Sequence, residues 1–238
     1  MNNSLYDITY SNLAWILFPV LAVLVIYYRW SLGVNQAIYG LSRMVLQLVL
    51  IGYALTFIFA AENPIIVTGI LSIMLVSASI IALRPVRNRT RSLYLKALAS
   101  IVVGSIITLV TVTQAVVNLD PWYQPRYLIP LAGMIFANSM NAVSIAAERF
   151  QVEIERSNCF TEVRKVAFQA ALIPVVNALF AVGLVSLPGM MTGQILSGIS
   201  PLIAVRYQIM VMCMIFGSAG ISCAVYLTLM KSDMAGRS

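Results

Sequence analysis

Long hydrophobic stretches with few charges follow one another along the 238-residue chain, and short polar connections separate them. A helix needs about 20 mostly apolar residues to cross the hydrocarbon core of a bilayer. Seven stretches come close to this length, and a proline that suits a first helical turn opens the third. The predicted spans are Leu13–Tyr28, Met44–Ala61, Ile65–Leu83, Ala97–Val117, Leu128–Ala147, Phe168–Leu187 and Ile203–Met230. The pattern therefore predicts an all-α integral membrane protein with about seven transmembrane helices.

Composition supports this fold class. Hydrophobic residues make up 61% of the chain and charged residues only 10%, whereas a soluble domain typically carries about 25% charged residues. There is too little polar surface to cover a water-soluble globule, so most of the chain must face lipid. No internal repeat or soluble domain is visible, and residues 1–238 are predicted to form one membrane-spanning domain.

Basic residues cluster in alternate connections, which predicts the orientation of the spans. Cytoplasmic loops of membrane proteins carry an excess of Lys and Arg. Two basic residues, Arg126 and Arg206, fall on the opposite side. We therefore expect a multi-pass protein of the cytoplasmic membrane with its N-terminus outside and its C-terminus inside. The clustered residues are Arg29, Arg43, Arg84, Arg87, Arg89, Arg91, Lys96, Arg149, Arg156, Arg164, Lys165, Lys231 and Arg237.

Several kinds of chemistry are disfavoured by what the sequence lacks. It contains no histidine and no CxxC pair among its three cysteines, so a zinc or disulfide scaffold is not expected. It has no GxxxxGK[ST] loop for nucleotide phosphates. We expect no enzyme activity and no cofactor bound by this chain, and any ATP must be used by a partner. The net charge of +7 reflects the basic loops, so no nucleic-acid partner is predicted.

Polar residues form a stripe along the fifth predicted span. Met134, Asn138, Asn141 and Glu148 follow one another at i, i+4, i+7 and i+14, within an arc of about 80° on a helix. Such a stripe is costly in contact with hydrocarbon, so it should face the bundle interior or a water-filled route. The two asparagines either hydrogen-bond across helices as packing contacts or line the path of a substrate.

A segment rich in glycine and proline interrupts the last third of the chain. Residues 188–202 form either a short outer loop or a broken helix that folds back into the membrane. Met190, Met191 and Gln194 lie in this segment and are candidate path residues. Thioethers can meet a soft transition metal, although methionine is also a common gap-filler.

The connection Glu148–Lys165 mixes both signs of charge, which suits docking to a soluble partner. A solvated connector is the alternative. If it docks, a short helix along the membrane that leads into the sixth span could transmit a push. The candidate coupling residues are Glu153, Glu155, Arg156, Asn158, Glu162, Arg164 and Lys165.

Two motifs resemble a known family over nearly the whole chain. Residues 129–134 read IPLAGM and are followed by NSMN at 138–141, while residues 183–194 read GLVSLPGMMTGQ and are followed by RYQI at 206–209. These motifs resemble the FetB-type permeases, which include bacterial iron exporters and plant aluminium-tolerance transport proteins.

The resemblance implies a permease that pairs with a FetA-type ABC ATPase, as a homodimer with two ATPases. The family's ATPase-contacting segment usually carries a glycine, where this chain has Asn158, a residue that tolerates a left-handed turn. The implied function is export of iron or another metal ion. The alternative is an ABC permease for an organic solute such as a nucleotide sugar, while a membrane enzyme ranks last. The sequence fixes neither the substrate nor the direction of transport.

Overall fold

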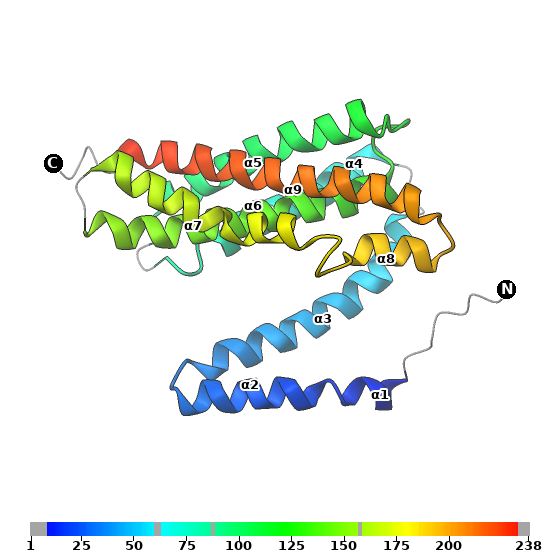
Figure 1. The fold of residues 1–238 in the computed structure, drawn as a ribbon, viewed down its shortest axis with the longest axis horizontal. Helices are drawn as coiled ribbons and strands as arrows, with labels where there is room; N and C mark the ends of the chain where they lie inside the picture. The colour runs from blue at the N-terminus through cyan, green and yellow to red at the C-terminus, as the bar shows by residue number, and fades with distance from the viewer. Residues whose placement is uncertain (1–8, 60–62, 87–88, 157–158, 233–238) are drawn as a thin grey trace. The chain divides into compact units, whose positions relative to one another are not determined.

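The computed structural model describes residues 9–59, 63–86, 89–156 and 159–232. These residues fall into two compact units, 1–61 and 62–238, which are described separately. Within the described ranges every regular element is a helix, and seven helices are long and apolar enough to cross a membrane (Figure 1). The predicted all-α class and the number of spans are therefore confirmed. The orientation and the single-domain organisation stay predictions.

The first unit is a helical hairpin with a short leading helix: α1 (Tyr10–Ala14), α2 (Leu17–Arg29) and α3 (Val34–Ile58). The chain turns into α3 at Gly33, whose φ of 70° lies in the left-handed region that glycine adopts freely. Neither α2 nor α3 contains a buried residue.

Helix α3 begins ten residues before the predicted start of the second span at Met44. Polar residues in this part of the helix, among them Arg43, lower its hydropathy below that of a spanning segment. The helical backbone hydrogen bonds nevertheless continue through it. In the amide orientation that satisfies both side chains, Arg43 Nε and Nη2 donate to Gln47 Oε1 at 2.9 and 3.2 Å. The guanidinium thus has a polar partner one turn along its own helix.

The second unit is a helical bundle. Asn63 caps the first of them, since its Oδ1 accepts from the amide of Ile65 at 2.9 Å, and Pro64 occupies the first turn as predicted. Helix α6 is central and packs against α4, α5, α7 and α9. In order, the elements are α4 (Pro64–Ala82), α5 (Arg91–Val110) with its π-helical continuation η1 (Thr111–Val116), α6 (Pro125–Ile154), α7 (Phe160–Ala181), α8 (Gly189–Leu196) and α9 (Pro201–Leu229).

Helices α5 and α9 approach closely at Gly104. A Cβ at this position would lie 2.2 Å from Ser222 Oγ and 2.8 Å from the Ser222 backbone nitrogen. Only glycine fits there, because the atoms that a Cβ would meet include backbone atoms of α9, which cannot move aside as a side chain can. Small residues at helix contacts are the usual means of close packing in membranes.

The core of the second unit consists of two clusters that differ in composition. The alanine cluster surrounds the C-terminal half of α6, and eight of its 21 buried residues are alanines: Ala82, Ala97, Ala142, Ala146, Ala147, Ala167, Ala171 and Ala219. The methionine cluster surrounds the N-terminal half of α6. Six of the chain's 12 methionines belong to it or pack against it: Met74, Met134, Met140, Met190, Met210 and Met214.

Two connections differ from the prediction. The stretch Glu148–Lys165 is mostly helix, because α6 continues to Ile154 and α7 begins at Phe160. No separate helix precedes the sixth span among the described residues, since α7 is continuous. The predicted loop was wrong because charged residues can extend a spanning helix beyond the hydrocarbon, and an i,i+4 ion pair supports them here.

The sixth span ends at Ala181 rather than at the predicted Leu187. A tight turn follows, in which the amides of Leu184, Val185 and Ser186 all approach the Ala181 carbonyl at 2.8–3.2 Å. Gly183 and Gly198, with φ of 83° and 89°, stand before and after α8. Helix α8 has eight residues, about 12 Å, which is too short to span a bilayer.

Candidate functional site

A cavity of about 50 Å³ lies in the second unit, where the N-terminal part of α6 meets α8 and α9. Its lining contains three thioethers from three helices: Met134 of α6, Met190 of α8 and Met210 of α9. The other lining residues are Val117, Arg126, Tyr127, Pro130, Leu131 and Tyr207.

The fold brings together two of the predicted path residues at this cavity. Met134 and Met190 are 56 positions apart in the sequence, yet both are half-buried and pack against the methionine cluster. Met210 completes the set and was not predicted. Its only sequence signal is its place just after the RYQI motif, and a lone methionine in an apolar helix is normally a gap-filler.

The lining determines which ligands the cavity suits. Thioether sulfur is a soft, uncharged ligand that favours soft metals. None of the described residues that line the cavity carries a carboxylate, and Arg126 at its edge is exposed. In the part of the chain that is described, no group of three or more His, Cys, Asp or Glu side chains is placed to hold a metal ion.

The predicted stripe on α6 becomes more exposed towards the C-terminal end of the helix. Met134 and Asn138 are half-buried, whereas Asn141 and Glu148 are exposed. The Asn138 amide donates to the carbonyl of Met134 at 2.8 Å, one turn back on the same helix. This amide is therefore bonded within its own helix, and Asn141 is not packed in the interior. That the stripe faces a water-filled route stays a prediction.

Helix α8 carries the remaining candidates. Met191 is half-buried and does not line the cavity. Gln194 Oε1 is buried without a hydrogen-bond partner among the described residues. Gln208 of α9 has the same property and is only 5% exposed. Buried amides without partners are rare in native cores, but no sequence pattern singles out Gln208.

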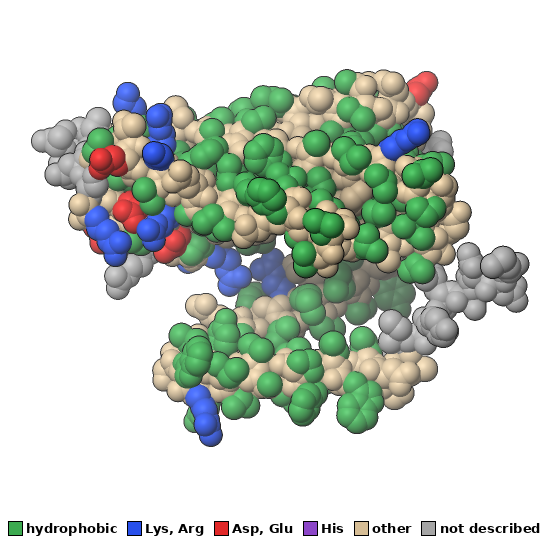
Figure 2. Space-filling model, viewed as in Figure 1, with side chains coloured by type: hydrophobic (Ala, Val, Ile, Leu, Met, Phe, Trp, Pro, Cys, Tyr) green, Lys and Arg blue, Asp and Glu red, His purple; other side chains and the backbone are tan. Residues whose placement is uncertain are grey.

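Charged residues gather at the other end of α6, where it approaches the start of α7 (Figure 2). Glu153 lies between two arginines, with its Oε1 2.8 Å from Arg149 Nη2 and 3.7 Å from Arg156 Nη1. The Arg164 guanidinium lies 5.5 Å from the centre of the Phe160 ring.

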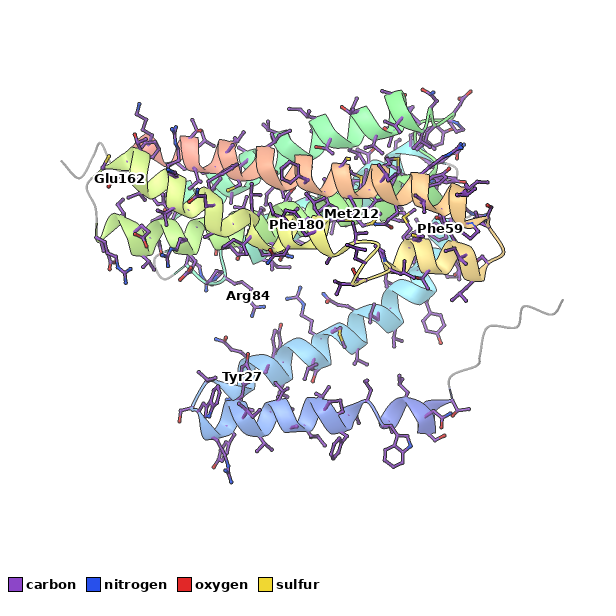
Figure 3. All side chains as sticks on the ribbon, viewed as in Figure 1. Tyr27, Phe59, Arg84, Glu162, Phe180 and Met212 are labelled. Carbon is purple, nitrogen blue, oxygen red and sulfur yellow. The ribbon has the colours of Figure 1, made fainter. Side chains whose placement is uncertain are left out.

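The other predicted coupling residues are spread over the same end. Glu155 follows α6 directly, while Glu162 and Lys165 are exposed on the first turns of α7, where Figure 3 labels Glu162. Asn158 lies outside the described residues. The structure places the described candidates at one end of the bundle, and their role in coupling stays a prediction.

Together the two units define a multi-pass membrane protein, whose larger unit has a thioether-lined cavity at one end and paired charges at the other. Comparison with known proteins identifies its family. The chain belongs to the uncharacterised protein family UPF0014, which it matches over residues 10–234.

Relatives come from bacteria and plants. The chain is 36% identical to the UPF0014 membrane protein slr1647 of Synechocystis sp., over 90% of this chain and 89% of the relative. It is 34% identical to the protein ALUMINUM SENSITIVE 3 of Arabidopsis thaliana, over 85% and 79% of the two chains. It is 31% identical to the probable iron export permease protein FetB of Escherichia coli, over 95% and 93%. The resemblance to FetB-type permeases is thus confirmed, and no solved structure shows significant similarity.

Proposed function

We propose that this chain is the membrane-spanning permease subunit of an ATP-driven transporter that exports iron or another metal ion. A separate FetA-type subunit hydrolyses the ATP, and two permease chains assemble with two ATPases. The observation that carries the proposal is the similarity over 95% of this chain to a probable iron export permease, and a small cavity lined by methionines of α6, α8 and α9 offers a place for a metal ion.

Helix α6 offers a physical link between an ATPase and a substrate. It is continuous from Pro125 to Ile154 and carries Met134 near one end and Glu153 near the other. These two positions are 19 residues apart, or about 28 Å along the axis. Because a packed helix moves as a rigid element, a displacement of the charged end would also displace the cavity wall.

The size of the cavity argues against the organic-solute alternative. Pockets for ligands of drug size usually measure about 300–1,000 Å³, whereas this cavity has about 50 Å³. That volume admits an ion with few water molecules. A nucleotide sugar would also need several basic groups for its phosphates, and Arg126 is the one cation among the lining residues.

The test is reconstitution of the purified chain with its candidate ATPase, taken from a neighbouring gene. We expect the two to co-elute from detergent, and ATP hydrolysis to rise when the permease is present. Vesicles that contain both should move iron when ATP is added. An ATPase variant without its P-loop lysine is the control. Separate elution together with unstimulated hydrolysis would reject the proposal.

The stripe on α6 gives a second readout in the same vesicles. Asn141→Ala removes an exposed amide, so it should leave assembly intact while transport falls about 10-fold if the amide lines the route. Asn138→Ala should also reduce transport, and it additionally removes a half-buried hydrogen bond worth about 1 kcal/mol. Unchanged transport in both variants would show that the stripe serves packing.

A further inference from the structure

Half of the methionines of this chain are concentrated in one cluster at one end of the bundle. Methionine ordinarily fills irregular gaps in a core. If these methionines served only that purpose, their side chains should occupy the space between the helices. Here three of the cluster's methionines border space that remains open, about 50 Å³. A void needs roughly 10–15 Å³ of this measure to hold one water molecule, so the space is large enough for an ion.

The charge around the cavity distinguishes between kinds of metal. Hard ions such as Mg²⁺ bind carboxylate, carbonyl and water oxygens, but the described lining residues include no carboxylate and include the guanidinium-bearing Arg126. The lining is otherwise apolar, and the cost of taking an ion out of water rises steeply with its charge. A divalent or trivalent ion would therefore lose more hydration energy here than a monovalent ion, without an anionic ligand to offset it.

We propose that this cavity is a binding site for a soft monovalent metal ion of the Cu(I) and Ag(I) class, held by the thioether sulfurs of Met134, Met190 and Met210. Neutral sulfur ligands suit such an ion, and a thioether has no proton to lose on binding. Transport of the bound ion as cargo rests on the proposed permease function, whereas binding does not.

The experiment uses Ag(I) as the probe, because it does not change oxidation state under ordinary conditions. Cys159 and Cys213 are exposed thiols that would bind silver, so every protein carries Cys159→Ser and Cys213→Ala. The purified full chain is titrated with Ag(I) in chloride-free detergent buffer against a competing chelator, and bound silver is measured after desalting. We expect one silver ion per chain at the cavity.

The decisive comparison is between two methionine variants. Replacing Met134, Met190 and Met210 together by leucine removes the sulfurs at nearly constant volume and should weaken binding at least about 100-fold. Met212→Leu is the matched control, because Met212 is half-buried on the same helix and does not line the cavity (Figure 3). It points about 200° away from Met210 around α9 and should bind silver within about 2-fold of the parent.

X-ray absorption of the silver-loaded protein supplies a readout that a folding defect cannot imitate. Sulfur neighbours lost in the triple variant but kept in Met212→Leu support the site. Neighbours that are only oxygen or nitrogen, equal silver binding by the triple variant, or binding of Fe²⁺ with none of Ag(I) would each overturn it.

The two proposals can fail separately. If vesicles with the ATPase move iron equally with the parent and the triple variant, and silver binding is also equal, the silver site is rejected and the permease stands. If silver binding depends on the three methionines but ATP drives no metal movement, the site stands and the transport proposal is rejected.

Discussion

The two halves of α6 pack against their neighbours with different side chains. The alanine cluster contains Ala142, Ala146 and Ala147 of α6 together with five alanines of other helices, and the nearby α5–α9 contact at Gly104 is close enough to exclude a methyl group. In the methionine cluster, Leu131 and Ile135 of the same helix lie among side chains that include long flexible methionines, and Leu131 borders the cavity. One helix thus joins a tightly packed region to an adaptable one.

This difference separates two mechanical tasks. Small side chains bring helix backbones together and leave few alternative rotamers, so the alanine cluster should hold its helices in fixed register. Methionine has three rotatable side-chain bonds and can adapt to an incoming ligand. A force applied at the charged end would therefore pass through a stiff region before it reaches one that can rearrange.

The largest loss of stability is expected at Gly104, where α5 and α9 pack too closely to admit a Cβ. Gly104→Ala places a Cβ 2.8 Å from backbone of α9, so the helices must separate, at a cost of about 1–3 kcal/mol. Denaturant unfolding of the purified chain measures this loss. Gly220→Ala on α9 is the control, since a Cβ there meets nothing within 4 Å. Equal stability of the two variants would contradict the tight contact.

A smaller effect is expected in the methionine cluster. Met214 is 2% exposed, and Met214→Leu should lower the free energy of unfolding by less than about 1.5 kcal/mol, because the volume is nearly conserved. Ala146→Leu in the alanine cluster, where the side chain is fully buried, should cost more than this in the same unfolding measurement. The reverse order would contradict the close packing of the alanine cluster.

The smallest effect on stability is expected at the charged end. Glu153→Gln removes both ion pairs with Arg149 and Arg156, and such pairs near the surface contribute at most about 1 kcal/mol. If this end docks the ATPase, co-elution and stimulated ATP hydrolysis should nevertheless fall, because two arginines lose the group that positions them. Asp120→Asn, which removes an exposed carboxylate near the opposite end of α6, is the control, and an identical response of both variants would count against a specific role for Glu153.

The spanning helices were predictable from the sequence because hydrocarbon imposes length and composition on them. Their ends were less predictable. Helix α3 starts at Val34 rather than at Met44, and α6 continues beyond Ala147 to Ile154. In both places polar side chains lower the local hydropathy, while the helical backbone hydrogen bonds continue. The apolar pattern in the sequence therefore ends before the helix does.

The candidate site was predictable only in part. Met134 was singled out from the polar stripe on the fifth span and Met190 from the segment rich in glycine and proline, and the fold does bring them to one cavity. Met210 and the buried Gln208 were missed, because their significance arises from packing between α6, α8 and α9. Asn141 was expected to face either the interior or a route; it is exposed in the single chain, and its role stays a prediction.

The glycines on either side of α8 have a consequence for how a bound ion could leave. Met134 and Met210 are mounted on long spanning helices, whereas Met190 sits on an eight-residue helix joined to the chain through Gly183 and Gly198. Rotation at these two positions meets no Cβ, so α8 could swing without unwinding any spanning helix. Such a movement would withdraw Met190 from the cavity and leave Met134 and Met210 as the thioether residues that line it.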